Sequence, residues 1–392
     1  MEKPTAKNFI TNIIDNDNNT NKFGGRVNTR FPPEPNGYLH IGHAKSICLN
    51  FEIAKSYGGK CNLRFDDTNP EKENIEYIDS IKNDIKWLGY KWDSIHYASD
   101  YFEQLYTFAQ MLIKNNYAYV DSSSPEIIKK ERGTLTEPGI KSKDRERLPD
   151  ESLKIFEQMK QGKFNDGEYV LRLKIDMSSP NINMRDPVIY RIKKVEHHRT
   201  KNDWCIYPMY DFTHCISDAI ENITHSLCTL EFEDHRDLYE WVIEKINHEN
   251  QPQQIEFARL ALEHNLMSKR KLSELVEKNY VESWDGPRMP TLSGMKRRGY
   301  TPNAIKDFCN RIGITKKNSA IEMGVLENTI REELNLTAKR VMGVLDPIKV
   351  TLVNYPKDER EIIKAAYNPN DINSGERNIS ISRNIFIDKN DF

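Results

Sequence analysis

The sequence predicts an α/β fold built on a parallel sheet, followed by a helical region and then by further strands. Strand and helix patterns alternate over residues 25–99, which is typical of βαβ units with parallel strands. Short helical patterns dominate residues 261–340, and strand patterns return after residue 345. At 392 residues the chain is too long for one ordinary core, so several domains are expected.

The first elements define the expected ligand site. Asn69 is predicted as the N-cap of the second helix, with Pro70 in its first turn. Ligands bind beyond the carboxyl ends of parallel strands, so the loop after the first strand is expected at such a site. The elements predicted here are strands at 26–31 and 60–67 and helices at 43–58 and 69–89.

Residues 100–198 have a looser pattern and are predicted to be an insertion between the two halves of the sheet. Strand and helix patterns resume over 204–246. In the insertion we expect a helix at 101–120 and strands at 168–176 and 188–194; beyond the sheet we expect helices at 273–278, 301–313 and 319–335 and strands at 347–355 and 377–388.

Bulk composition excludes some classes of protein. The charge is 57 − 59 = −2, and no run of 18 apolar residues exists, so neither a basic coat protein nor a membrane span is predicted. Residues 285–340 hold 11 Lys/Arg and 6 Asp/Glu, a modest basic excess. Six scattered cysteines without a C-x-x-C pattern favour reduced thiols in the cytoplasm.

The string RFPPEPNGYLHIGHAKS (residues 30–46) runs from a strand through a proline-rich loop into a helix. His40 and His43 lie at the start of that helix, where free N–H groups favour phosphate. Taken alone, the pair could be ordinary histidines. No Cys, Asp or Glu set with zinc-site spacing accompanies them, so no metal site is predicted.

A second string, EHNLMSKRKLSEL (residues 263–275), places three cations beside a serine. Taken alone it is typical of a solvated basic loop. Together with the histidine loop it suits adenylate transfer, because both groups of donors can stabilise charge that develops on an α-phosphate.

The two strings, HIGH at 40–43 and MSKRK at 267–271, resemble the signature motifs of class I aminoacyl-tRNA synthetases, with Leu266 in place of an idealised lysine. CNLRFDDTNP, RDPVIYRIK and WCIYPMYDFTHCISDAIENITHSLCTLEF further resemble the glutaminyl-tRNA synthetase family, and the likeness runs from about residue 8 to 392. The resemblance implies a Rossmann-type parallel sheet split by an α+β insertion, followed by a helical subdomain and the start of a β-barrel.

The same resemblance implies domain boundaries. Family members continue past the point where this sequence stops, so residues 1–345 are expected to form a complete catalytic and acceptor-binding unit. The last 47 residues are expected to form a less stable partial barrel with little anticodon reading. The implied domains are the Rossmann halves at 25–99 and 199–260, the acceptor-stem-binding insertion at 100–198, the helical subdomain at 261–340 and the partial anticodon-binding barrel at 341–392.

The implied reaction is the ATP-dependent ligation of L-glutamine to the 3′ end of tRNA(Gln) through a glutaminyl-adenylate, giving AMP and diphosphate. Mg²⁺ accompanies ATP, and activation needs bound tRNA. The implied partners are tRNA(Gln), L-glutamine and ATP, and a monomer without membrane contact is expected.

The resemblance also assigns residues. His40, His43 and Lys269 match catalytic positions. The positions that match ATP contacts are Glu34, Pro35, Asn36, His40, Ile41, Gly42, His43, Ala44, Lys45, Ser46, Thr229, Arg259, Leu260, Met267, Ser268 and Lys269.

For glutamine, Arg30 matches a residue near the substrate carboxylate, Asp66 the ammonium ligand and Tyr210 the ligand of the side-chain amide. Asp66 could instead cap a turn, and Tyr210 could belong to the core. Cys228 and Phe232 match pocket walls, although packing alone explains them equally well.

For tRNA, Leu135 matches a wedge at the first acceptor base pair, Asp234 a base-reading residue and Arg340 an anticodon contact. A helix N-cap is the alternative for Asp234. Rival functions are a glutamyl-tRNA synthetase of the archaeal or eukaryotic type, a nucleotidyltransferase that shares the HxGH loop, and a catalytically inactive RNA-binding relative.

Overall fold

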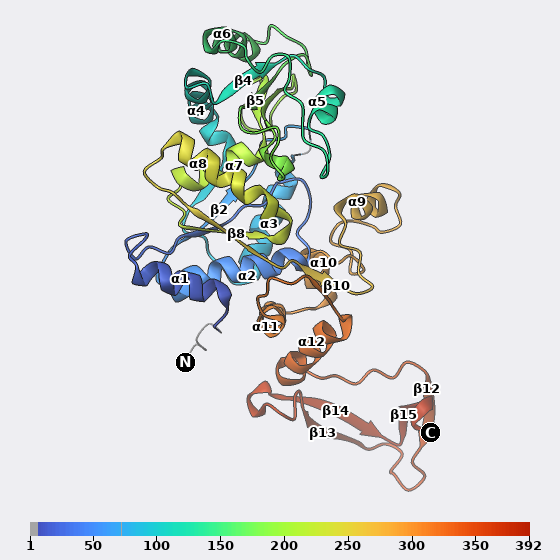
Figure 1. The fold of residues 1–392 in the computed structure, drawn as a ribbon. Coiled ribbons are helices and arrows are strands. Elements are labelled where there is room, and N and C mark those ends of the chain that lie inside the picture. The colour runs from blue at the N-terminus through green and yellow to red at the C-terminus, as the bar shows by residue number, and fades with distance from the viewer. Residues whose placement is uncertain (1–6, 72) are drawn as a thin grey trace.

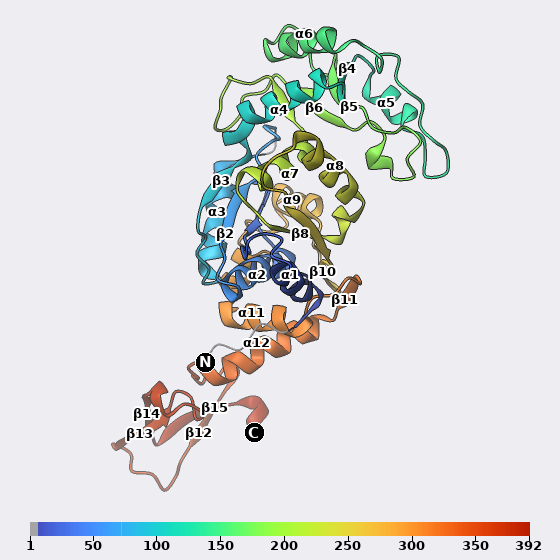
Figure 2. The same ribbon diagram turned by 60° about the vertical axis from the view of Figure 1, so that its left-hand side comes forward.

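The structure is a computed structural model that describes residues 7–71 and 73–392. The chain is elongated: the insertion lies at one end, the parallel sheet and its helices lie in the middle, and the C-terminal strands lie at the other end (Figures 1 and 2). The chain begins in the middle part, passes into the insertion and returns to the middle part. It then continues through the helical region to the C-terminal strands.

The central sheet consists of two parallel sets of strands that meet edge to edge. The amides of Thr224 and His225 donate to the carbonyl of Asn28 at 3.0 and 3.2 Å, which places β8 beside β1. The strand order is therefore β3-β2-β1-β8-β9, and it reverses between β1 and β8, where ligands bind in such sheets. The strands are β1 (Thr29–Phe31), β2 (Cys61–Phe65), β3 (Ile95–Tyr97), β8 (His225–Thr229) and β9 (Gln253–Phe257).

Helices cover both faces of this sheet, and the predicted α/β fold class is confirmed. Ile10 and Ile14 of α1 pack with Leu227 and Phe257 of the strands. The helices are α1 (Phe9–Asn19), α2 (Ile41–Ser56), α3 (Ile75–Trp87), α7 (Tyr210–Ile220) and α8 (Arg236–Ile246).

The predicted start of α3 is wrong. The helix begins after Asn74, whose side chain accepts the Glu76 amide at 3.0 Å. The predicted cap, Asn69, lies in the preceding loop, and its amide donates to the Glu73 carboxylate at 2.7 Å. Local side-chain bonds therefore hold residues 69–71, 73 and 74 outside the helix.

The insertion is built on an antiparallel sheet of order β4-β5-β6-β7. The helix predicted at 101–120 ends at Lys114, and Ala118 to Asp121 form a strand because they pair with β5. The sheet reaches Pro208, beyond the predicted boundary at 198. The elements are α4 (Phe102–Lys114), β4 (Ala118–Asp121), α5 (Pro125–Glu131), α6 (Pro149–Lys160), β5 (Val170–Leu173), β6 (Val188–Ile192) and β7 (Ile206–Pro208).

The helical region after the sheet packs against α2. Ile305 and Phe308 share a buried core with Ile47 and Phe51. The helix predicted at 319–335 begins as a strand, β11, because residues 319–321 pair with β10. The elements are β10 (Leu260–Leu262), α9 (Lys269–Glu277), α10 (Leu292–Arg298), α11 (Pro302–Ile312), β11 (Ser319–Ile321) and α12 (Met323–Thr337).

The C-terminal residues form two antiparallel pairs, β12 with β15 and β13 with β14, and no closed barrel is formed among the described residues. Strand β13 was not predicted. Within residues 7–71 and 73–392, no helix is both long and apolar enough to cross a membrane. The strands are β12 (Pro347–Thr351), β13 (Arg360–Ala366), β14 (Glu376–Ser382) and β15 (Asn384–Asp388).

Candidate active site

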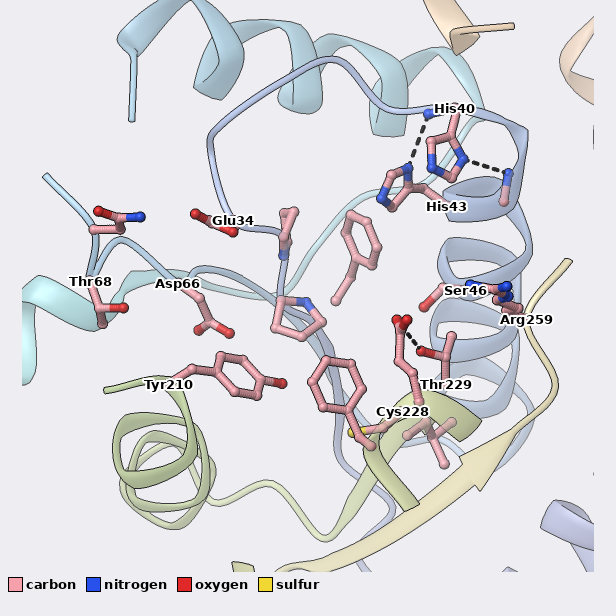
Figure 3. A pocket seen from close by; sticks show the side chains of 18 of the residues that line it. Glu34, His40, His43, Ser46, Asp66, Thr68, Tyr210, Cys228, Thr229 and Arg259 are labelled. Atoms are coloured by element: carbon pink, nitrogen blue, oxygen red, sulfur yellow. Dashed lines mark hydrogen bonds between the residues drawn. The ribbon is translucent and has the colours of Figure 1, made fainter. Parts of the chain in front are cut away.

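A cavity of about 730 Å³ lies beyond the carboxyl ends of the central strands, at the point where the strand order reverses. Figure 3 shows His40 and His43 together on one side of it and Asp66 and Tyr210 across from them. The predicted residues that line it are Glu34, His40, Gly42, His43, Ser46, Asp66, Tyr210, Cys228, Thr229, Phe232, Arg259, Leu260 and Met267.

Hydrogen bonds fix the tautomer of both histidines. The Nδ1 atom of His40, the N-cap of α2, accepts the amide of Gly42 at 3.1 Å. The Nδ1 atom of His43 accepts the amide of His40 at 3.0 Å, and the two ring centroids are 3.9 Å apart. Because each Nδ1 is an acceptor, the proton of each neutral ring lies on Nε2.

Burial keeps these rings uncharged. It lowers the pKa of His40 to about 4. Burial, and then the neighbouring His40, hold the pKa of His43 well below its usual value. At neutral pH the two residues therefore offer N–H donors without positive charge, beside the amino end of α2, where helix dipoles favour anions.

The two signature loops meet at two glycines. A Cβ atom on Gly42 would lie 2.8 Å from the terminal methyl of Met267, and one on Gly37 would lie 2.8 Å from Cε of Lys269. The Nζ atom of Lys269 lies 6.0 Å from the centre of the Tyr77 ring. The MSKRK segment therefore packs directly on the histidine loop, although Lys269 does not line the cavity.

At the opposite end Asp66 carries an unused acceptor. Its Oδ1 accepts Nε of Arg64 at 2.8 Å, whereas its buried Oδ2 has no hydrogen-bond partner. Burial tends to raise the pKa of this carboxyl, but Arg64 and then His214 outweigh it and lower the pKa. Asp66 is therefore a charged carboxylate with one oxygen available to a cation.

Tyr210 supplies a neutral polar group to the same end of the cavity. It is the first residue of α7, and its ring stacks on His214 with centroids 4.9 Å apart. Burial raises the pKa of its phenol well above the usual value. The hydroxyl therefore stays protonated and can both donate and accept.

Arg30 lies behind the cavity wall rather than on its surface. Its fully buried guanidinium donates to Asp218 Oδ1 at 2.9 Å and to the Leu227 carbonyl at 2.9 Å. Arg64 donates to the same Asp218 oxygen at 2.7 Å. This paired network was not predicted as a site, although Asp218 lies in one of the strings that carried the resemblance.

The remaining predicted ATP residues do not line the cavity. Ile41 and Ala44 join the core under α2, and Nζ of Lys45 donates to the Ala258 carbonyl at 2.9 Å. Ser268 is the N-cap of α9. Pro35 and Asn36 shape the histidine loop, with the Pro35 carbonyl accepting the Asn74 amide and the Asn36 amide donating to the Glu34 carbonyl.

The predicted tRNA residues lie apart from the cavity lining. The Leu135 side chain is 80% exposed on the loop after α5. Nη1 of Arg185 donates at 2.8 Å to the carbonyls of Arg132, Thr134 and Glu137, so this loop is held from beneath. The sequence did not single out Arg185.

Asp234 and Arg340 are exposed. Asp234 lies in a 3₁₀ turn (Leu230–His235), and the N-cap of α8 is His235, so the helix-cap alternative for Asp234 is wrong. Nη2 of Arg340 donates to the Asn335 carbonyl at 3.1 Å.

Sequence reasoning missed two further features. Arg191 lines the cavity, and its Nε has no hydrogen-bond partner. A buried group of acidic and histidine side chains lies beside the Asp66 loop; its members are Asp67, Glu73, His197 and His198. Asp67 and His197 are 130 residues apart, so no local sequence pattern indicates that their side chains meet.

Comparison with known families decides the relationship. Residues 26–336 match the model of the catalytic domain of class I tRNA synthetases (E and Q). The chain belongs to the class I tRNA synthetases of the E and Q group. Residues 338–392 match the anticodon-binding domain of this group, so the predicted membership is confirmed.

Among relatives, a Glutamine--tRNA ligase of Proteus mirabilis is 59% identical over 391 residues, and one of Salmonella paratyphi B is 58% identical. Each match covers 100% of this chain and 70% of the relative. The structure of the glutamate-tRNA synthetase of Elizabethkingia anophelis superposes with a TM-score of 0.58 at 19% identity. The match covers 80% of this class I synthetase and 71% of the other chain. A glutamate tRNA ligase structure from Elizabethkingia meningosepticum gives the same TM-score. At this identity the structures share the fold.

Proposed function

We propose that this class I synthetase ligates L-glutamine to the 3′ end of tRNA(Gln) through a glutaminyl-adenylate, with ATP converted to AMP and diphosphate. The observation that carries the proposal is the 59% identity to a Glutamine--tRNA ligase along the whole chain. The glutamyl alternative shares the family models, which cover both E and Q members, but its likeness to the solved glutamate-tRNA synthetase is at 19% identity. The proposed chemistry assigns one substrate to each end of the cavity.

ATP is proposed to bind with its phosphates at the histidine end. The glutamine carboxylate would attack the α-phosphate, diphosphate would leave, and charge would build on the phosphate oxygens. The Nε2–H groups of His40 and His43 are fixed in direction before that charge appears, so they stabilise it with little reorganisation. Lys269 is proposed to supply the cation from the opposite loop.

The other predicted ATP residues are proposed to act around this centre. Thr229, Arg259, Leu260 and Met267 line the same cavity. Mg²⁺ would arrive with ATP as part of the substrate, and the exposed carboxylates of Glu34 and Glu231, which line the cavity, supply the oxygen donors that this ion prefers.

Glutamine is proposed to bind at the other end. Oδ2 of Asp66, which is buried and accepts no hydrogen bond, would accept the substrate ammonium; Nδ1 of His214 lies 3.7 Å from it. The Tyr210 hydroxyl would meet the side-chain amide. Arg30 is proposed to act from behind the wall, because it holds Asp218 and the carbonyl of Leu227 rather than facing the cavity.

The tRNA is proposed to contact both ends of the elongated molecule. Leu135, exposed on a loop that Arg185 holds, would wedge the first acceptor base pair, and Asp234 would read the stem beside it. Arg340 would contact the anticodon arm. We further propose that the protein works as a monomer in the cytoplasm.

ATP–diphosphate exchange tests the proposal. Exchange should require glutamine and tRNA, and glutamate should be discriminated against by about 10⁴-fold, because its carboxylate brings an unpaired charge into a site built for an amide. Comparable exchange with glutamate would favour the glutamyl alternative. Exchange that needs no tRNA would contradict the proposal, and RNA binding without any exchange would favour the inactive relative.

A further inference from the structure

The segment that leaves the insertion sheet after β6 touches the loop that carries Asp66. His197 in this segment is fully buried, and its Nε2 lies 2.9 Å from the main-chain carbonyl of Asp67. Its ring packs against Phe102 and Tyr207, with centroids 5.6 and 5.9 Å away. One side chain therefore joins residues 130 positions apart.

The tautomer of His197 follows from its other nitrogen. Nδ1 accepts the amides of Arg199 and Thr200, both at 3.2 Å. The proton of the ring therefore lies on Nε2, and this N–H donates to the Asp67 carbonyl. The same ring thus caps its own turn and bonds to a distant loop.

Two acidic side chains complete the arrangement. The Asp67 carboxylate accepts the amide and hydroxyl of Ser99 at 2.8 and 2.7 Å. Oε1 of Glu73 accepts the Asn69 amide at 2.7 Å. Oε2 of Glu73 lies 3.5 Å from Nε2 of His197 and has no hydrogen-bond partner of its own.

The grouping has the composition of a metal site, since atoms of Asp67, His197 and His198 lie within 4.8 Å of one another. A metal ion on Nε2 of His197 would move the ring proton to Nδ1, where it would face two amide N–H groups. That clash favours a hydrogen-bonded clamp over a metal centre.

The clamp acts on the backbone of a loop whose carboxylates are also held, Asp66 by Arg64 and Asp67 by Ser99. Strand β2 ends at Phe65, so the backbone of residues 66–69 has left the sheet ladder and needs other partners. It finds them at three points: the Asp66 amide donates to the Pro33 carbonyl at 3.1 Å, the Asp67 carbonyl accepts from His197, and the Asn69 amide donates to Glu73.

We propose that His197 is a positioning residue for the amino acid substrate: it holds the Asp67 carbonyl and thereby sets the Asp66 carboxylate in place for the substrate ammonium. The inference rests on the proposed function and adds to it a residue from the insertion side. His197 does not line the cavity, so it acts only through the Asp66 loop.

This role has a kinetic signature. Asp66 binds the substrate ammonium equally before and during adenylate formation. A less precise position of Asp66 therefore weakens binding of glutamine and of the transition state by the same amount. Loss of one buried hydrogen bond corresponds to about tenfold in affinity. The KM for glutamine should therefore rise about tenfold, while kcat and the KM for ATP stay near those of the unchanged chain.

Two substitutions separate the two bonds of the ring. In His197→Asn the short amide replaces Nδ1 and can still accept the amides of Arg199 and Thr200, but it cannot reach Asp67. In His197→Gln the amide nitrogen takes the place of Nε2 and can still donate to the Asp67 carbonyl. The asparagine variant should show the tenfold rise, and the glutamine variant should restore most of it.

A matched control comes from His248, whose Nδ1 accepts the Asn250 amide at 3.1 Å and which does not line the cavity. His248→Asn should leave the KM for glutamine unchanged. The measurements are diphosphate exchange at saturating tRNA with glutamine and ATP varied separately, and thermal unfolding of each variant.

Three outcomes would overturn the inference. They are an unchanged KM for glutamine in His197→Asn, an equal rise in the KM for glutamine and for ATP, and a stoichiometric divalent cation in the purified protein that disappears in His198→Ala. Failure of the proposed function would look different, because the unchanged chain would then show no glutamine-dependent exchange at all.

Discussion

The two ends of the cavity bury ionisable side chains by different means. At the proposed ATP end, His40 and His43 accept backbone amides and lie against each other, so burial lowers both pKa values and the rings stay neutral. At the proposed amino acid end, Asp66 and Asp218 are more deeply buried, but guanidinium groups lie against them and both pKa values fall, so the carboxylates stay charged.

The contrast follows what each end is proposed to hold. A triphosphate brings its own charge and needs directed donors, and a neutral imidazole with a fixed N–H supplies one without attracting a counter-ion. An ammonium needs a permanent anion, which a buried site can keep only if cations stand behind it. Arg30 and Arg64 are those cations, which explains why Arg30 faces away from the cavity.

The largest effect is expected for Asp218→Asn. This change keeps the shape of the side chain but leaves Arg30 and Arg64 with less negative charge in a fully buried place. Breaking such a pair costs about 3–5 kcal/mol, and the free energy of unfolding in urea should fall by that amount. A loss below about 1 kcal/mol would show that the carboxylate is not what balances the two guanidiniums.

The next largest effect is expected for His43→Asn. The short amide still accepts the His40 amide in place of Nδ1, but the N–H at Nε2 is lost. Removing one donor of this kind lowers kcat by about 10²–10³-fold, and the KM for ATP should change little because the donor acts mainly on the transition state.

His43→Gln, which places an amide nitrogen near Nε2, should recover part of that loss in kcat. Single-turnover adenylate formation at saturating ATP is the measurement. A rise in the KM for ATP with kcat unchanged would mean that His43 binds ground-state phosphate instead.

Much of the ATP end could be predicted from the sequence, because a proline-rich loop, a glycine and two histidines three apart lie within 17 residues and are close in space by necessity. Asp66 and Tyr210 were also predicted to lie in the site, and both line the cavity. Both assignments came from the resemblance to the family, since the alternating pattern alone singles out neither residue.

The remaining features depend on contacts that no local pattern records. Arg30 lies on a central strand with both faces covered, so alternation does not tell which way its side chain points. His197 and Asp67 are 130 residues apart. The predicted start of α3 was wrong because the Asn74 side chain caps the helix at Glu76 and the Glu73 carboxylate holds the Asn69 amide in the preceding loop.

A smaller effect should appear in the pH dependence of stability. The folded pKa of His40 is about 4, below the usual value near 6.5, so the unfolded chain binds a proton first as the pH falls. Stability from this group is complete above pH 6.5 and is lost as the pH falls toward 4.

The variant His40→Asn should therefore lose less stability than the unchanged chain on acidification from pH 6.5 to pH 4.5. Urea unfolding at four pH values in this range is the measurement. Parallel curves for the two proteins would mean that His40 is not held neutral by burial.

The smallest effect is expected for Glu221→Gln, the matched counterpart of Asp218→Asn. Both carboxylates face Nη1 of Arg64, but Glu221 lies 3.4 Å away and Asp218 lies 2.7 Å away.

Burial, opposed in part by Arg64 and supported by Asp218 and Asp66, raises the pKa of Glu221 to about 7. The folded chain therefore keeps a proton that the unfolded chain releases, and stability falls as the pH rises from 4.5 to about 7. A neutral amide removes this loss, so the variant should lie within about 1 kcal/mol of the unchanged chain at pH 5.5 and be more stable than it above pH 7. If Glu221→Gln instead destabilises the protein as much as Asp218→Asn at every pH, the two carboxylates contribute equally to balancing the charge of Arg64, and the greater role given to Asp218 is wrong.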